Sequence, residues 1–238
     1  MDLFFHYIDI LEVKYMYEYE KDLKDSNYQE REEKAKHIKK ISYALFFIIP
    51  VILIAIAIGF ALNKSETIEK RGLTVKIIGD RNNVAERYIN DIDAVDDYLI
   101  GLPDKLVLTK HNVDKEAGID DSNSSEGVNA LTIPEDKTIY IQTDKYDSMT
   151  LMHEFFHLFD FATGQKSQTD EFKTLVEKYK DELDLNSYEL SNQYESFVGV
   201  MLKYRYETRL LKFKVPEVYK FCDNLVKDYE KQISMENH

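Results

Sequence analysis

Two histidines and a glutamate near the middle of the chain have the spacing of a metal-dependent hydrolytic site. His153, Glu154 and His157 form the pattern His-Glu-x-x-His. Residues four apart lie on one face of a helix, so His153 and His157 can present two imidazole nitrogens to a single metal ion. Glu154 can reach a water molecule at that ion without being a ligand itself. Two histidine ligands and a glutamate base are the arrangement of a zinc peptidase.

The helix expected to carry this motif is apolar on nearly every side. Its apolar residues are Leu151, Met152, Phe155, Phe156, Leu158, Phe159 and Phe161. His153, His157 and Asp160 form a polar stripe on this helix, and a buried polar group without a partner costs about 1–3 kcal/mol. A metal ion would satisfy the stripe, and Gly164 is suited to end the helix. The alternative is a core helix that carries two histidines by chance.

A third metal ligand must come from another part of the chain, because catalytic zinc usually takes three protein ligands and keeps one position for water. No histidine occurs between His157 and His238, so a carboxylate on a later helix is expected. Glu195 is the best candidate, since its helix is otherwise apolar and Gly199, one turn later, permits close approach of another helix. Glu189 is the main rival. A solvated helix glutamate remains the alternative interpretation of Glu195.

The part of the chain around these residues predicts a mixture of strands and helices. Apolar patterns predict strands at 74–78, 105–109 and 137–143, and helices at 82–100, 169–184, 188–211 and 216–233. The polar stretch 111–129 is expected to be a loop that borders the site. The strand at 137–143 directly precedes the motif helix. In zinc peptidases a strand at this place commonly forms the sheet edge, to which an extended peptide can add by backbone hydrogen bonds.

An uncharged apolar segment lies nearer the N-terminus, at residues 41–62. A helix of this length reaches about 33 Å, which is enough to cross a hydrocarbon core of about 30 Å. Pro50 is tolerable inside a membrane helix. The segment is too long, and begins too late, for an ordinary cleaved signal peptide. A fully buried core helix is the alternative.

Basic residues flank this segment unequally. Those before it are Arg31, Lys34, Lys36, Lys39 and Lys40, and those after it are Lys64, Lys70 and Arg71. This excess predicts an N-terminus inside the cell and a C-terminal part outside. The expected organisation is an N-terminal cytosolic helical segment at 1–40, a transmembrane helix at 41–62, a linker at 63–72 and a catalytic domain at 73–238.

The composition excludes some partners and leaves the compartment open. The 238 residues carry a net charge of -13, and the C-terminal part has no basic cluster, which argues against binding to nucleic acid. The single cysteine, Cys222, cannot form an intrachain disulfide. Its apolar helical surroundings predict a buried thiol.

The motif and its distant partners resemble a known family. The chain is similar to the catalytic domain of anthrax lethal factor and its relatives, which include the bacterial Pro-Pro endopeptidases. These gluzincins carry His-Glu-x-x-His, then a tyrosine, then a glutamate seven residues after it. Here the matching residues are His153 to His157, Tyr188 and Glu195, and the spacing from tyrosine to glutamate is kept. The resemblance covers residues 73–238 and is specific at the site.

The resemblance implies a zincin-like α+β domain that binds one zinc ion (Zn²⁺) through His153, His157 and Glu195. Glu154 would activate the water, and Tyr188 would donate its hydroxyl to the oxyanion of the tetrahedral intermediate.

The chain departs from the family at one position. The family often carries a second acidic residue one turn after the ligand glutamate, where it can orient a zinc-bound histidine. This chain has Gly199 there, and Asp160 is the candidate substitute.

The sequence therefore predicts a single-pass protein of the cell membrane with an outward zinc metalloendopeptidase domain, a hydrolase that acts on peptide bonds of extracellular or surface proteins. Two alternatives stay open. One is a catalytically inactive relative that uses the groove to bind metal or peptide. The other is a membrane-anchored signalling or interaction protein whose working part is residues 1–40.

Overall fold

The computed structural model describes residues 28–62, 64–119 and 128–236. The chain divides into two compact units, with the boundary between Ala61 and Leu62. Each unit is described by itself. The expectations for residues 1–27 and for the part of the polar loop at 120–127 lie outside the described residues.

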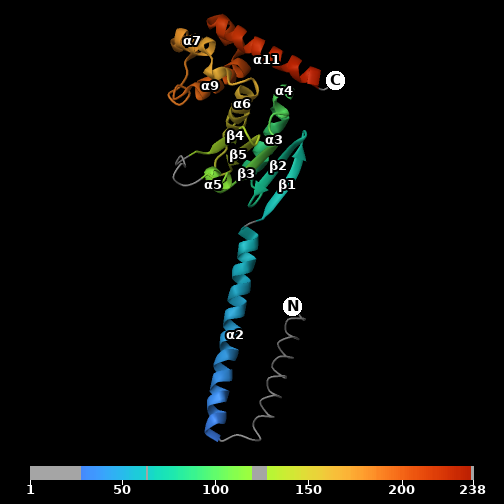
Figure 1. The fold of residues 1–238 in the computed structure, drawn as a ribbon, viewed down its shortest axis with the longest axis vertical. Helices are drawn as coiled ribbons and strands as arrows, with labels where there is room; N and C mark the ends of the chain where they lie inside the picture. Colours follow the sequence, from blue (N-terminus) through green and yellow to red (C-terminus); the bar gives the residue numbers. More distant parts are fainter. Residues whose placement is uncertain (1–27, 63, 120–127, 237–238) are drawn as a thin grey trace. The chain divides into compact units, whose positions relative to one another are not determined.

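The described part of the first unit consists of one long helix, α2 (Tyr28–Leu62), which contains Pro50 (Figure 1). The stretch Glu33–Ile54 is long and apolar enough to cross a membrane, and none of it is buried in the protein. Large apolar side chains such as Phe46 and Phe47 are exposed on it. The predicted apolar helix is therefore present. It is continuous with the polar residues before it, which the sequence analysis assigned to a separate segment.

The second unit contains a mixed sheet of five strands in the order β1-β2-β3-β5-β4. The strands are β1 (Ser65–Lys70), β2 (Leu73–Ile78), β3 (Lys105–Thr109), β4 (Ala130–Ile133) and β5 (Thr138–Gln142). The three central strands are parallel to one another, and both edge strands are antiparallel to their neighbours. Val75, Leu106 and Ile139 lie in register across the centre and are fully buried. The prediction of a mixed α+β unit is confirmed, and the three predicted strands are its central ones.

The two edge strands were not predicted, and they correct two expectations. β1 occupies most of the segment expected to be a linker at 63–72. Its charged side chains are typical of an exposed edge, which such residues protect from further pairing. The second correction concerns β5, which lies between β3 and β4. The free edge therefore belongs to β4, and the expected edge role of the strand at 137–143 is wrong.

The helices of this unit are shorter than the sequence periodicity suggests. They are α3 (Asn83–Asp91), η1 (Ile92–Ala94), α4 (Asp97–Ile100), α5 (Val113–Glu116), α6 (Thr150–Ala162), η3 (Lys166–Gln168), α7 (Asp170–Lys178), α8 (Lys180–Leu183), α9 (Gln193–Tyr206), α10 (Thr208–Lys214) and α11 (Pro216–Glu236). The helix expected at 82–100 is interrupted because Val95 has an extended backbone. The helix expected from residue 188 begins at Gln193, because Asn192 is extended and its side chain accepts the N–H of Glu195. Pro216 opens the last helix, as predicted.

Helix α6 lies between the β4–β5 side of the sheet and α9 (Figure 1). Phe155, Phe156 and Phe159 on α6 have no exposed surface. The ring of Phe159 lies 5.5 Å from that of Tyr98 and 5.3 Å from that of Tyr229. These contacts connect α6 to α4 and α11 and surround the motif helix with aromatic core. The helix ends at Ala162, and Gly164 follows with a positive φ of 79°, which glycine adopts without strain.

The first prediction concerns this aromatic core. Phe159→Ala leaves a cavity among packed rings and should lower the free energy of unfolding by about 3–5 kcal/mol. Phe161→Ala, on the same helix but 42% exposed, is the matched control and should cost about 1 kcal/mol or less. Urea unfolding followed by tyrosine fluorescence measures both, since the chain has 17 tyrosines and no tryptophan. Equal losses for the two variants would contradict this description of the core.

Candidate metal centre

Helix α6 presents His153 and His157 on one face, as their spacing predicts. Their Nε2 atoms lie 3.1 Å apart, and their rings meet edge to face with centroids 4.8 Å apart. The two side chains keep 17% and 19% of their surface exposed. Both side chains are therefore mostly buried, and a small part of each is exposed to solvent.

Helix α9 brings Glu195 to the same point. Glu195 lies in the first turn of α9, where Asn192 Oδ1 accepts its N–H at 3.0 Å. Its Oε2 lies 3.1 Å from His153 Nε2, and its Oε1 lies 3.5 Å from His157 Nε2. The three predicted ligands thus converge, with their ligand atoms all within 4.8 Å of one another. Glu189, the rival candidate, is not a member of this group.

The geometry of this group fits a metal ion. With zinc bonds of about 2.0–2.1 Å, tetrahedral ligand atoms lie about 3.3 Å apart. The separations of 3.1 and 3.5 Å fall on either side of that value. Glu195 Oε2 is buried, and His153 Nε2 lies 3.1 Å from it. A buried carboxylate needs a positive partner, and the two imidazoles and this carboxylate are close enough to share one, so His153, His157 and Glu195 can hold a metal ion. Two imidazoles and one carboxylate suit zinc and other divalent first-row metals.

The charges of the group are strongly coupled. Burial alone raises the pKa of Glu195, but the hydrogen-bonding histidines His153 and His157 outweigh it and bring the pKa to about 2. Burial alone lowers the pKa of His157, but Glu195, Glu154 and Asp160 together raise it above its ordinary value. The carboxylate is therefore ionised and favours a proton on His157. A bound divalent cation would take the place of that proton.

Glu154 lies beside this group and is held by the free edge of the sheet. Its side chain is only 5% exposed. Thr132 of β4 donates its hydroxyl to Glu154 Oε2 at 2.6 Å. The charge of Glu154 also contributes to the raised pKa values of His157 and Tyr188. Glu154 is therefore close to the predicted ligands without being one of them, and Thr132 is a contact that no sequence signal indicated.

Tyr188 lies in the turn before α9 and not on a helix. Its ring centroid is 6.0 Å from that of His153, and the residue is 59% exposed. Desolvation and the carboxylates of Glu195 and Glu154 raise its pKa to about 12. Its hydroxyl therefore keeps its proton at neutral pH and can donate a hydrogen bond beside the group. Only the family resemblance pointed to this tyrosine.

Asp160 does not have the role expected of it. Its Oδ1 accepts the N–H of Ser167 at 2.8 Å, and its Oδ2 accepts the hydroxyl of Ser167 at 2.6 Å. In the part of the chain that the structure describes, no hydrogen bond joins Asp160 to a histidine. Asp160 instead fixes the end of α6 to η3, and the expectation that it orients a ligand histidine is wrong.

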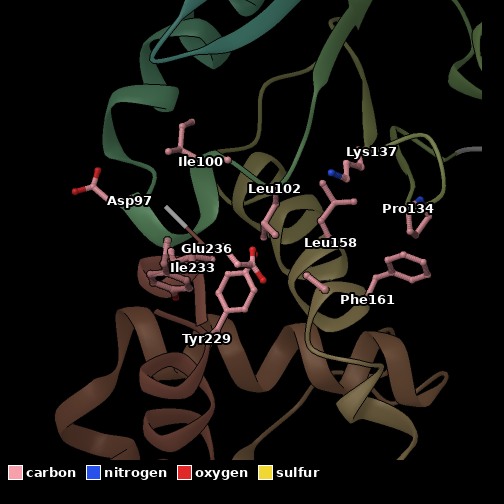
Figure 2. A pocket seen from close by; sticks show the side chains of 13 residues that line it. Asp97, Ile100, Leu102, Pro134, Lys137, Leu158, Phe161, Tyr229, Ile233 and Glu236 are labelled. Atoms are coloured by element: carbon pink, nitrogen blue, oxygen red, sulfur yellow. The ribbon is translucent and has the colours of Figure 1, made fainter. Parts of the chain in front are cut away.

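A separate hollow lies further along α6 (Figure 2). It has a volume of about 680 Å³ and contains none of the candidate ligands. Leu158 and Phe161 of α6, Pro134 and Lys137 of the β4–β5 turn, and Tyr229 and Ile233 of α11 line it. Asp97, Lys137 and Glu236 add charged groups to this lining (Figure 2), and the hollow does not include the candidate metal centre.

Comparison with known proteins adds no information to this geometry. No protein-family model matches the chain, and no curated protein matches it.

The second prediction follows from the charges of the group. Zinc ligation requires neutral imidazoles, and an ordinary histidine has a pKa of about 6.5. Because the pKa of His157 is raised, protons begin to compete with the metal for this imidazole at a higher pH than they would for an ordinary histidine. Zinc affinity should therefore fall steadily as the pH drops from 8 to 5. Competition with a colorimetric zinc indicator measures it, with His153→Ala as the control that binds weakly at every pH. Unchanged affinity down to pH 4 would contradict a two-histidine site.

Proposed function

We propose that this chain is a membrane-anchored, zinc-dependent endopeptidase with a zincin-like catalytic domain. One observation carries the proposal. His153, His157 and Glu195 converge, with Glu195 Oε2 3.1 Å from His153 Nε2 and Glu195 Oε1 3.5 Å from His157 Nε2. Three protein ligands of these types are typical of catalytic zinc, because they leave a position for water or substrate. The similarity of the motif to the lethal factor family supports the same assignment.

In the proposed reaction, Glu154 carries out the proton transfers. His153, His157 and Glu195 would hold a zinc ion, which would supply Lewis acidity toward water and a peptide carbonyl when bound. Glu154 accepts the proton of the attacking water and then gives it to the leaving amine. The hydrogen bond from Thr132 to Glu154 Oε2 orients the carboxylate. Glu154 is buried, which keeps bulk water from competing for hydrogen bonds to it.

Tyr188 supplies a hydrogen bond to the oxyanion that develops as the carbonyl is attacked. A donor aimed at developing charge stabilises the transition state more than the ground state. The raised pKa of Tyr188, about 12, keeps the phenol protonated over the whole neutral range. Its exposure leaves room for a substrate beside it.

The free edge of β4 is the natural place for an extended substrate. β4 pairs with β5 on one side only. Its Thr132 contacts Glu154, so a peptide that adds to this edge by backbone hydrogen bonds passes next to the proposed base. This position replaces the one that the sequence analysis assigned to the strand at 137–143.

The apolar stretch of α2 supports anchoring in the cell membrane. The excess of lysine and arginine before it supports an N-terminus inside and a catalytic domain outside. The substrates are then extracellular or surface proteins.

The third prediction tests the reaction. Glu154→Gln should keep one zinc per chain, because Glu154 is not a ligand, and should lower peptide hydrolysis by about 10²–10⁴-fold. Elemental analysis and a peptide-library assay measure the two properties. Glu177→Gln, an exposed substitution on α7, is the control and should leave both unchanged. If wild type and Glu154→Gln give the same zinc content and no cleavage, the chain is a binding relative and not a peptidase.

The fourth prediction tests the orientation. An external protease added to intact cells should degrade residues 65–238, while a cytosolic marker protein stays intact. The chain should stay in the membrane fraction after alkaline carbonate extraction, because α2 crosses the bilayer. Degradation only after the membrane is made permeable would reverse the proposed orientation, and release by carbonate would exclude a spanning helix.

A further inference from the structure

We infer that Glu189 is a positioning residue for Tyr188, and that it acts by lying against the bare backbone of α9 at Gly199. The inference rests on the proposed function, since the role of Tyr188 belongs to it. The segment concerned is residues 186–191, which we call the Tyr188 turn. It precedes α9 and carries Tyr188 at its exposed side.

The close contact at Gly199 is the first observation. A Cβ atom built on Gly199 would lie 3.0 Å from both Cγ and Cδ of Glu189 and 3.1 Å from its Oε1. Such distances are too short for ordinary contact, so the side chain of Glu189 fills the space that a side chain at 199 would need. The other glycines described, such as Gly101, have nothing within 4 Å of a built Cβ. Gly199 is therefore required by this contact and not by its own backbone conformation.

Hydrogen bonds extend the contact to the whole Tyr188 turn. Ser196 of α9 donates its hydroxyl to the carbonyl oxygen of Glu189 at 2.7 Å. Glu189 Oε2 accepts the N–H of Asn186 at 2.7 Å. Asn186 Oδ1 in turn accepts the N–H groups of Tyr188 and Glu189, at 2.9 and 3.0 Å. Glu189 thus joins the turn to α9 through its main chain and closes the turn through its side chain.

Tyr188 has few contacts outside the turn. More than half of its surface is exposed, its ring lies 6.0 Å from that of His153, and a hydrogen bond with Glu195 contributes to its raised pKa. The position of its hydroxyl therefore depends on the backbone of the turn, and so on Glu189, together with the contact to Glu195. In the described residues the ion pairs of His153 and His157 are made with Glu195 and not with Glu189. Glu189 accordingly acts on the tyrosine and not on a ligand histidine.

A side chain at position 199 would press on Glu189, which would have to move by a few tenths of an ångström. Because Glu189 accepts the N–H of Asn186 and its carbonyl accepts the hydroxyl of Ser196, such a shift would reach the residue next to it in sequence, Tyr188.

Gly199→Ala is the diagnostic substitution, because helix propensity and the contact predict opposite effects. Alanine is a better helix former than glycine, so an alanine in open space would be neutral or stabilising. Here it must displace Glu189. The matched control is Gly101→Ala, where φ is -85° and the space is open.

The experiment uses the full chain in detergent micelles and measures zinc content, kcat and KM. Gly199→Ala should lower kcat by at least about 10-fold. This loss should not exceed the loss of about 10²–10³-fold expected for Tyr188→Phe, which removes one oxyanion donor. Zinc content and KM should stay near those of wild type. In the Glu189→Ala or Tyr188→Phe background, adding Gly199→Ala should change kcat less than about twofold, because the effects share one cause. The inference would be overturned if Gly199→Ala lowered kcat as much in the Tyr188→Phe background as in the wild type. It would also be overturned if Gly199→Ala lost its zinc.

A second measurement does not depend on activity. Amide hydrogen exchange of residues 186–191 should become faster in Gly199→Ala, and Glu189→Ala should show the same increase with or without Gly199→Ala. Exchange at wild-type rates in Gly199→Ala would show that Glu189 does not hold the turn. If the wild-type chain binds zinc but cleaves no peptide, the proposed function fails, and the exchange rates still decide whether Glu189 fixes Tyr188.

Discussion

The packing of α6 against α9 is the constraint on which the candidate site depends. The two imidazoles come from α6 and the carboxylate from α9. Phe159 of α6 and Phe197 of α9 pack with ring centroids 6.4 Å apart, and Phe172 of α7 packs against Phe197 at 5.5 Å. Because side chains in such a core are closely packed, a change in their volume shifts one helix against the other. The core therefore determines whether two nitrogens and an oxygen can share one cation.

The same packing creates an electrostatic demand. Glu195 remains ionised in a mostly buried position, where its contacts with His153 and His157 lower its pKa. An isolated buried carboxylate is unfavourable, and a nearby positive charge offsets that penalty. A protonated imidazole or a divalent cation could supply this charge. The metal ion is the form that the proposed function requires.

The elements that local sequence determines were predictable from sequence. The spacing of His153 and His157 requires only one helix, and the central strand β3 carries the buried apolar run Leu106, Val107 and Leu108. Glu195 could be inferred because it is polar in an otherwise apolar helix. The breaks near Val95 and before Gln193 could not, since they depend on which side chain caps which amide. β4 was not predicted, because it is only four residues long and lies between a polar loop and a turn. Its contact with Glu154 and the packing of Glu189 on Gly199 exist only after the chain folds.

The brevity of β4 has a consequence for selectivity on the proposed function. The four residues of β4 can pair with only a few residues of a guest strand. Main-chain hydrogen bonds depend on an extended backbone and not on the identity of the side chains. Helical or compactly folded targets cannot offer such a stretch, so flexible tails and loops are favoured before any residue is recognised. Because Thr132 of this strand already holds Glu154 through a hydrogen bond, a guest strand on β4 would meet an acid–base group that is positioned in advance.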